Sequence, residues 1–275
     1  MSKVILIVCD ALRDDMAAQH MGYLEHLVEH HKATRWTVTG ELPSMSRPMY
    51  ETLHTGVPSS VHGIVNNAIV RVSNMPNVFK LAVEHGKTTA AAAYCWYSEL
   101  YNRAPFDPVR DLETDDETLP IQHGRFYMSD DYPDLDLYAH GGALLAKYMP
   151  DYLLIHPMGL DTVGEREGGD SHAYRKLVIY HDGVISYMLP TALQLGYTVL
   201  VTADHGISGN AAHGHGGVHG GNFDEARLVP LYLITPDMNG RGRVTGHVSQ
   251  LSVAPTLCRL LGLPIPDTMT QPPLG

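Results

Sequence analysis

The chain has 275 residues, and its 19 lysines and arginines against 30 aspartates and glutamates give a formal net charge of −11. This length predicts one α/β domain with an inserted lobe rather than two domains. The acidic balance argues against a nucleic acid polymer or an anionic membrane as partner and leaves small-molecule substrates open.

Apolar segments with strand-like and helix-like periodicity alternate along the chain. The predicted strands are 3–9, 36–39, 88–94, 152–156, 198–202 and 229–234. The predicted helices are 49–55, 77–85, 139–148, 173–195 and 250–261. This alternation predicts an α/β fold with a mostly parallel central sheet and helices on both faces.

The segment 101–138 interrupts the pattern, because it is acidic, contains several prolines and has weak periodicity. We expect it to form an inserted lobe or a long loop near the active site. The whole chain, 1–275, is then a single domain.

The cysteine and hydropathy patterns bear on the compartment. Cys9, Cys95 and Cys258 lie in apolar segments without metal-type or redox spacing, which indicates reduced core residues. No apolar run reaches the roughly 18 residues of a membrane helix, and the first strand begins within a few residues of Met1. We therefore expect a cytoplasmic protein without a membrane partner, and the oligomeric state stays open.

Three aspartates, Asp10, Asp161 and Asp204, each lie just past a predicted strand. Ligands of parallel α/β sheets bind beyond the carboxyl ends of the strands. We therefore expect these three carboxylates to converge on one edge of the sheet.

The pair Asp204-His205, directly after a hydrophobic strand, combines an oxygen and a nitrogen ligand that suit zinc or manganese. The alternative is a helix-capping Asp followed by a chance His, and Asp10 could likewise cap a helix. The glycine- and histidine-rich loop 206–221 adds His213, His215 and His219, of which at most one or two are expected to bind metal and the others to be solvated loop histidines.

The loop 42–48 holds Ser44 and Ser46 between prolines, ahead of a predicted helix whose N-terminal amides would favour an anion. A serine in this position could be an activated nucleophile. The alternative is that both are ordinary loop and cap serines.

Several motifs occur together in a fixed order. They are Ser46-Arg47-Pro48, Thr55-Gly56, His62-Gly63-Ile64-Val65-Asn66-Asn67, Asp204-His205-Gly206, His219-Gly220-Gly221 and Ala254-Pro255-Thr256. Their order and spacing resemble the alkaline phosphatase superfamily, in particular its type I phosphodiesterase and nucleotide pyrophosphatase branch. The resemblance covers most of the chain and implies an alkaline phosphatase-like fold with two divalent metal ions, zinc or manganese.

Carried over by position, the resemblance assigns the ligands of the two metals. The first metal would bind Asp10, Ser46, Asp204 and His205, and the second would bind Asp161 and His219. Glu165 stands where the family pattern has histidine, and it is expected to complete the second site, with His172 as the alternative.

The resemblance also assigns catalytic roles. Ser46 would be the nucleophile and Asn67 a donor to a phosphate oxygen, with a turn residue as the alternative for Asn67. His62 is expected to pack structurally. Tyr94, Trp96 and Tyr97 could stack on a base, although core packing is the favoured interpretation.

The implied function is that of a metal-dependent hydrolase of phosphoric esters acting through a phosphoseryl intermediate. A phosphodiesterase or nucleotide pyrophosphatase is the first choice, and a phosphomonoesterase or phosphonate hydrolase is the alternative. Two other classes stay open, a phosphomutase and a non-catalytic metal-binding protein.

Overall fold

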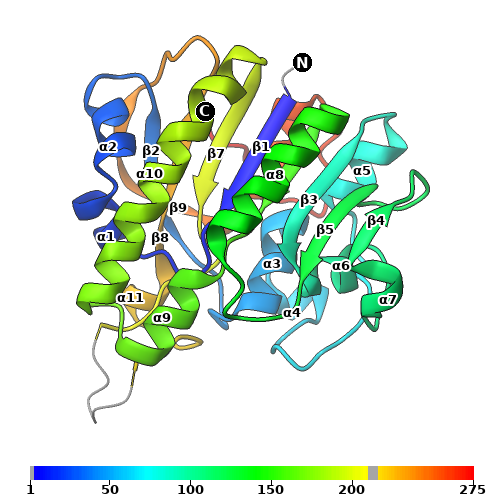
Figure 1. The fold of residues 1–275 in the computed structure, drawn as a ribbon, viewed down its shortest axis with the longest axis horizontal. Coiled ribbons are helices and arrows are strands. Elements are labelled where there is room, and N and C mark those ends of the chain that lie inside the picture. Colours follow the sequence, from blue (N-terminus) through cyan, green and yellow to red (C-terminus); the bar gives the residue numbers. More distant parts are fainter. Residues whose placement is uncertain (1–2, 210–215) are drawn as a thin grey trace.

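The computed structural model describes residues 3–209 and 216–275, which are built around one nine-stranded sheet (Figure 1). Its strand order is β4-β5-β3-β6-β1-β7-β8-β2-β9. The strands are β1 (Lys3–Val8), β2 (Thr34–Thr39), β3 (Thr89–Tyr94), β4 (Glu113–Asp115), β5 (His123–Tyr127), β6 (Tyr152–Ile155), β7 (Tyr197–Thr202), β8 (Leu228–Ile234) and β9 (Gly242–Ser249).

The centre of the sheet is parallel. β1 pairs in parallel with β6 and β7, and β3 pairs in parallel with β5 and β6. β8 runs antiparallel to both β7 and β2, and β4 runs antiparallel to β5. The apolar runs of β3, β6 and β7 are buried along their whole length, as expected for strands covered on both faces. The prediction of a mostly parallel α/β sheet is therefore confirmed.

Helices cover both faces of this sheet. In Figure 1, α8 and α10 cross the front, while α3 and α5 lie behind. The α-helices are α1 (Asp14–His20), α2 (Gly22–Glu29), α3 (Ser46–Thr55), α4 (Ser59–His62), α5 (Val78–Glu84), α6 (Cys95–Tyr101), α7 (Pro108–Asp111), α8 (Asp134–Tyr148), α9 (Gly159–Glu167), α10 (His172–Gln194), α11 (Asp224–Arg227) and α12 (Val253–Leu261). A 3-10 turn, η1 (Gln250–Ser252), precedes α12. Among the described residues, no helix has the length and apolar character needed to cross a membrane.

Residues 101–138 differ from the expected lobe. They include α7, the start of α8, and the strands β4 and β5, and β5 extends the main sheet by pairing with β3. These strands have three and five residues, too short for a clear period-2 pattern in the sequence. The edge strand β9 was also not expected, because its side chains are mostly exposed or half-buried and carry little hydrophobic signal.

The carboxyl ends of the central strands meet in register. Ile7 of β1 pairs with Ile155 of β6, and Val8 pairs with Thr202 of β7. Beyond these pairs, the amide of Asp10 donates to Pro157 O at 3.0 Å and so continues the alignment. The residues that follow β1, β6 and β7 are therefore neighbours at one edge of the sheet.

Candidate metal centre and nucleophile

Asp10, Asp204 and His205 form a fully buried cluster at this edge. One ligand atom of each lies within 4.8 Å of the others. His205 Nε2 is 3.3 Å from Asp204 Oδ2 and 3.5 Å from Asp10 Oδ1. Gly206, the next residue, permits a tight packing of this loop against α11, since a Cβ there would collide with the carbonyl of Glu225. The predicted convergence of Asp10 and Asp204 is thus present in the structure.

Ser46 is the first residue of α3, and it is almost completely buried beside this cluster. Its Oγ lies 3.2 Å from His205 Nε2. The expected row of free helix amides is not there, because the amide of Arg47 already donates to Asn67 Oδ1 at 3.0 Å and Pro48 has no amide hydrogen. Of the helix amides predicted to form an anion pocket, only that of Ser46, the first residue of the helix, is therefore left among these three residues.

A second group contains Asp161, His205 and His219, again with ligand atoms within 4.8 Å of one another. Asp161 was expected directly after a strand, but it lies inside the helix α9. Glu165 follows it one helical turn later. His219 Nε2 lies 3.2 Å from Glu165 Oε1 and 3.8 Å from Asp161 Oδ1. Its Nδ1 donates to Ser44 O at 3.2 Å, which leaves Nε2 facing the carboxylates.

The two alternatives for the second group differ in position. Glu165 contacts His219, whereas His172 is exposed at the start of α10 and is not a member of the group. His213 and His215 lie outside the described residues. The geometry therefore favours Glu165, and the assignment stays a prediction.

Three carboxylate oxygens in these groups, Asp10 Oδ1, Asp161 Oδ1 and Asp204 Oδ2, are buried without a hydrogen-bond partner in the described part of the chain. A buried polar atom without a partner is costly, so such atoms usually mark a bound ligand or ion. Oxygen donors beside the Nε2 atoms of His205 and His219 suit zinc or manganese. The residues present therefore fit a pair of divalent cations.

Burial and the close approach of the carboxylates set the pKa values in these groups. Burial, reinforced by the charge of Asp10, raises the pKa of both Asp161 and Asp204 above the usual range. Burial also opposes ionisation of Asp10, but the hydrogen bond from His156 and the proximity of His205 lower its pKa to about 2. Burial lowers the pKa of His205 to about 4, which keeps its imidazole neutral and able to act as a ligand.

Two contacts of Asp10 were missed in the sequence. His156 Nε2 lies 3.1 Å from Asp10 Oδ2, and the Tyr50 hydroxyl donates to the same oxygen. Tyr127 in turn donates to His156 O at 2.8 Å. These contacts hold Oδ2 and leave Oδ1 directed at His205. The sequence did offer a signal for His156, because this residue ends the predicted strand 152–156 and the carboxyl end of that strand lies at the same edge of the sheet as Asp10.

The aromatic residues near this edge are packed in the core, as favoured from the sequence. Tyr97 is buried and stacks on Tyr50 with a centroid separation of 4.4 Å. The guanidinium of Arg47 lies 4.3 Å from the ring centroid of Trp96. His62, also buried, contacts Thr52 Oγ1 at 3.1 Å, which agrees with a structural role.

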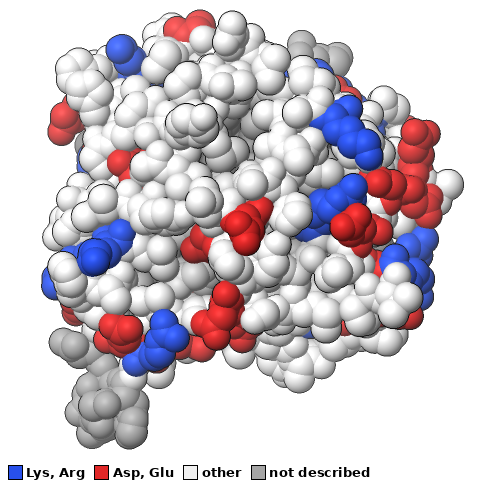
Figure 2. Space-filling model, viewed as in Figure 1, with Lys and Arg blue, Asp and Glu red and all other residues white. Residues whose placement is uncertain are grey.

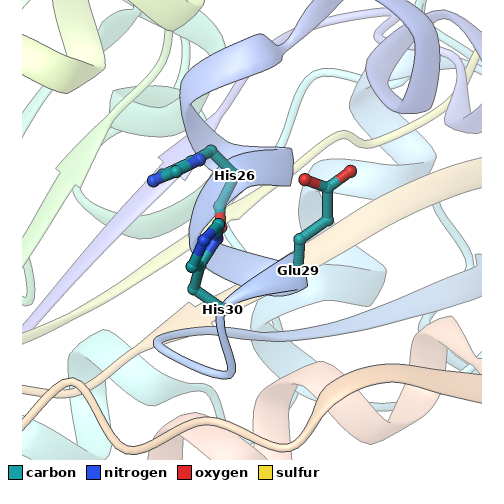
Figure 3. A group of neighbouring side chains, drawn as sticks. All are labelled: His26, Glu29 and His30. Atoms are coloured by element: carbon teal, nitrogen blue, oxygen red, sulfur yellow. The ribbon is translucent and has the colours of Figure 1, made fainter.

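An exposed group on α2, His26, Glu29 and His30, also has ligand-type atoms within 4.8 Å of one another. Figure 3 shows the two imidazole rings next to each other and the carboxylate of Glu29 pointing away from them. The Nδ1 of His30 donates a hydrogen bond to the carbonyl oxygen of His26 at 2.9 Å. The three side chains are exposed, so water can satisfy their polar atoms without an ion, and we assign the metals to the buried groups.

The charged side chains on the face seen in Figure 2 are scattered, with Lys and Arg lying among Asp and Glu. They form no continuous basic patch over the described part of this face. A polyanion would need such a patch. The expectation that no nucleic acid polymer binds is compatible with this face and stays a prediction.

Comparisons with known proteins agree with these observations. The family model for type I phosphodiesterase / nucleotide pyrophosphatase matches residues 4–223. Human GPI ethanolamine phosphate transferase 2, catalytic subunit, is 29% identical over 282 residues, an alignment that covers 96% of this chain and 27% of the transferase. The chain spans about a quarter to a third of the length of the curated relatives it matches.

Solved structures share the fold at low sequence identity. Murine ectonucleotide pyrophosphatase / phosphodiesterase 5 superposes with a TM-score of 0.75 at 14% identity, covering 96% of each chain. Wild-type alkaline phosphatase PafA superposes with a TM-score of 0.72 at 11% identity, covering 99% of this chain and 98% of that one. The alkaline phosphatase-like fold predicted from the sequence is thereby confirmed.

Proposed function

Because this chain belongs to the type I phosphodiesterase / nucleotide pyrophosphatase family of the alkaline phosphatase superfamily, we propose that it cleaves phosphate diesters with Ser46 as nucleophile. The observation that carries the proposal is the 3.2 Å distance between Ser46 Oγ and His205 Nε2 inside the buried ligand cluster. A protein that merely stored metal would need the carboxylates and imidazoles, but no hydroxyl among them.

Two divalent cations fit the proposal. The first cation would be held by Asp10, Ser46, Asp204 and His205. The second cation would be held by Asp161, Glu165 and His219. His205 lies within reach of both groups. When bound, the cations would lower the pKa of the Ser46 hydroxyl and offset negative charge on the phosphate and leaving oxygens.

The chain's own residues account for attack and orientation. Ser46 Oγ would form a bond to phosphorus while the bond from phosphorus to the leaving oxygen breaks on the opposite side. His205, whose Nδ1 contacts Gly206 O at 2.9 Å, keeps its Nε2 turned to the hydroxyl. Asn67 accepts from the Arg47 amide through Oδ1, so its Nδ2 is the atom that can donate to a phosphate oxygen.

The second step decides between hydrolysis and transfer. A water that attacks the phosphoseryl group would complete a hydrolysis, whereas an alcohol would complete a transfer. Transfer is supported as a second candidate, because the similarity to an ethanolamine phosphate transferase extends over 96% of this chain. The cytoplasmic location stays a prediction from the cysteine pattern.

An activity screen tests the proposal. The purified protein is incubated with zinc, manganese or magnesium chloride and with para-nitrophenyl phosphate, bis(para-nitrophenyl) phosphate or a phosphonate monoester. We expect the diester to be cleaved fastest, and product analysis with added glycerol separates hydrolysis from transfer. Absence of turnover on every ester in protein that has bound its cations would overturn the proposed function.

A further inference from the structure

The segment that carries Asn67 has few apolar anchors. It joins α4 to α5, and between Ile64 and Asn77 every residue is exposed or half-buried. Its contacts with the rest of the protein are mainly polar, such as the hydrogen bond of 2.5 Å from Ser73 Oγ to Glu51 Oε1. A phosphate-binding side chain on such a segment needs a specific contact to hold its position.

Arg47 provides that contact twice. Its backbone amide donates to Asn67 Oδ1 at 3.0 Å, and its Nε donates to the carbonyl oxygen of Asn67, also at 3.0 Å. The backbone of residue 47 therefore fixes the side-chain amide of Asn67, and the arginine side chain fixes the backbone of Asn67. With Oδ1 occupied, the amide cannot turn its oxygen toward the substrate without losing this bond.

Arg47 is itself held rigidly. Its side chain is only 2% exposed, and Nη2 forms an ion pair of 2.8 Å with Glu99 Oε2 on α6. The guanidinium lies over the ring of Trp96. Since Arg47 directly follows Ser46, it links α3, which bears the nucleophile, to α6 and to the segment that bears Asn67.

We propose that Arg47 is a positioning residue, which acts through Asn67 to hold the amide donor of Asn67 in register with Ser46. This inference rests on the proposed function. A buried arginine that served only stability could pair with Glu99 alone, whereas the side chain of Arg47 also donates through Nε to the carbonyl oxygen of Asn67.

A double-mutant cycle with bis(para-nitrophenyl) phosphate tests the inference. Arg47→Lys keeps the positive charge opposite Glu99 but removes the Nε donor, and we expect kcat to fall about 10-fold with little change in KM. Asn67→Ala should lower kcat about 100-fold. Because Arg47 acts through Asn67, the double variant should be no slower than Asn67→Ala, within about 2-fold. Inorganic phosphate should inhibit both single variants more weakly than the wild type.

Arg71→Lys is the matched control, since Arg71 lies on the same segment but donates to Val72 O and His62 O instead of Asn67. It should leave kcat within about 2-fold of the wild type. If Arg47→Lys does not fold, the paired replacement Arg47→Met with Glu99→Met removes both buried charges and should show the same loss of kcat.

The outcomes are distinct. Losses of kcat that multiply in the double variant, or full activity of Arg47→Lys, would overturn the positioning role. A wild-type protein that fails to cleave the ester with cations bound would instead count against the proposed function. Equal losses for Arg47→Lys and Arg71→Lys would show a general effect on the segment and would also overturn the inference.

Discussion

The two sides of Ser46 differ in how completely their polar atoms are bonded within the protein. On one side, a carboxylate oxygen of each of Asp10, Asp161 and Asp204 is buried without a partner. On the other side, both oxygens of Asn67 accept hydrogen bonds from Arg47. The first side is completed only by a ligand, whereas the second is preorganised by the chain itself. Cation binding should therefore change the first side far more than the second.

The largest expected effect on kcat comes from removing the hydroxyl of Ser46, which lies between the two sides. Ser46→Ala should lower kcat by about 10⁴-fold or more, because the attacking oxygen is lost. Cation affinity, measured by titration calorimetry with zinc or manganese chloride, should fall much less. Ser44→Ala is the control, since Ser44 Oγ donates to Gly221 O at 2.9 Å and is absent from the ligand groups. Near-normal turnover by Ser46→Ala would exclude it as the nucleophile.

Replacing Asp204 tests the side whose carboxylate oxygens have no described partner. Asp204→Ala should weaken cation binding about 10³-fold, because it removes a buried ligand oxygen. The matched control is Asp182→Ala, a buried aspartate whose two oxygens accept from the amides of Tyr23 and Leu24. That variant should lose thermal stability yet keep its cation affinity. Equal cation affinity in the two variants would contradict the ligand assignment.

The preorganised side also contains buried atoms without a partner among the described residues, and one of them belongs to Glu51. Its Oε2 is buried without a described partner, and burial raises the pKa of this carboxyl from 4.5 to about 7. The hydrogen bond from Ser73, the nearby hydroxyl of Tyr101 and the charge of Arg71 oppose the shift. A carboxyl whose pKa is higher in the folded state stabilises the fold when protonated, and this stability is lost as the pH rises through about 7.

Glu51→Gln imitates the protonated carboxyl and should remove this pH dependence. The wild type should lose stability between about pH 4.5 and pH 7, and above that range the variant should be more stable by about 3 kcal/mol. Urea unfolding at several pH values measures the difference. Glu84→Gln is the control, because Glu84 is exposed and forms only a 3.9 Å pair with Lys80. Parallel pH profiles for the wild type and Glu51→Gln would contradict the account.

The smallest expected effect is a change in cation affinity that distinguishes Glu165 from His172 as the ligand of the second cation. Glu165→Ala should weaken its binding about 10-fold, since Glu165 is a half-exposed ligand, whereas His172→Ala should have no effect. Elemental analysis after dialysis against graded metal concentrations gives the comparison. A loss in His172→Ala alone would reverse the assignment.

The sequence predicted the fold and the convergence of Asp10 and Asp204 because both follow long apolar strands, whose ends share one edge of a parallel sheet. It misplaced Asp161, since the helix α9 is short and polar and begins within four residues of β6. Tyr50 and His156 were missed because their roles depend on contacts with Asp10 across the fold. The bonds between Arg47 and Asn67 were invisible for the same reason, as spacing along the chain does not reveal which atoms meet.

The strands β4, β5 and β9, which lie at or next to the two ends of the sheet, show a second limit of the sequence. Their pairing energy comes from neighbouring strands rather than from their own hydrophobic pattern. The residues 101–138 therefore looked like a lobe while contributing two strands to the main sheet.

Covalent trapping of Ser46 tests the central claim most directly. The wild type, with its cations bound, is mixed with a phosphate ester, quenched in acid during the first turnover, digested and analysed by mass spectrometry. We predict an adduct on the peptide that contains Ser46 and none in Ser46→Ala: a phosphoryl group from a monoester, or a phosphoryl group that keeps the second ester group from a diester. Steady turnover without this adduct, or with the adduct on another residue, would contradict the account.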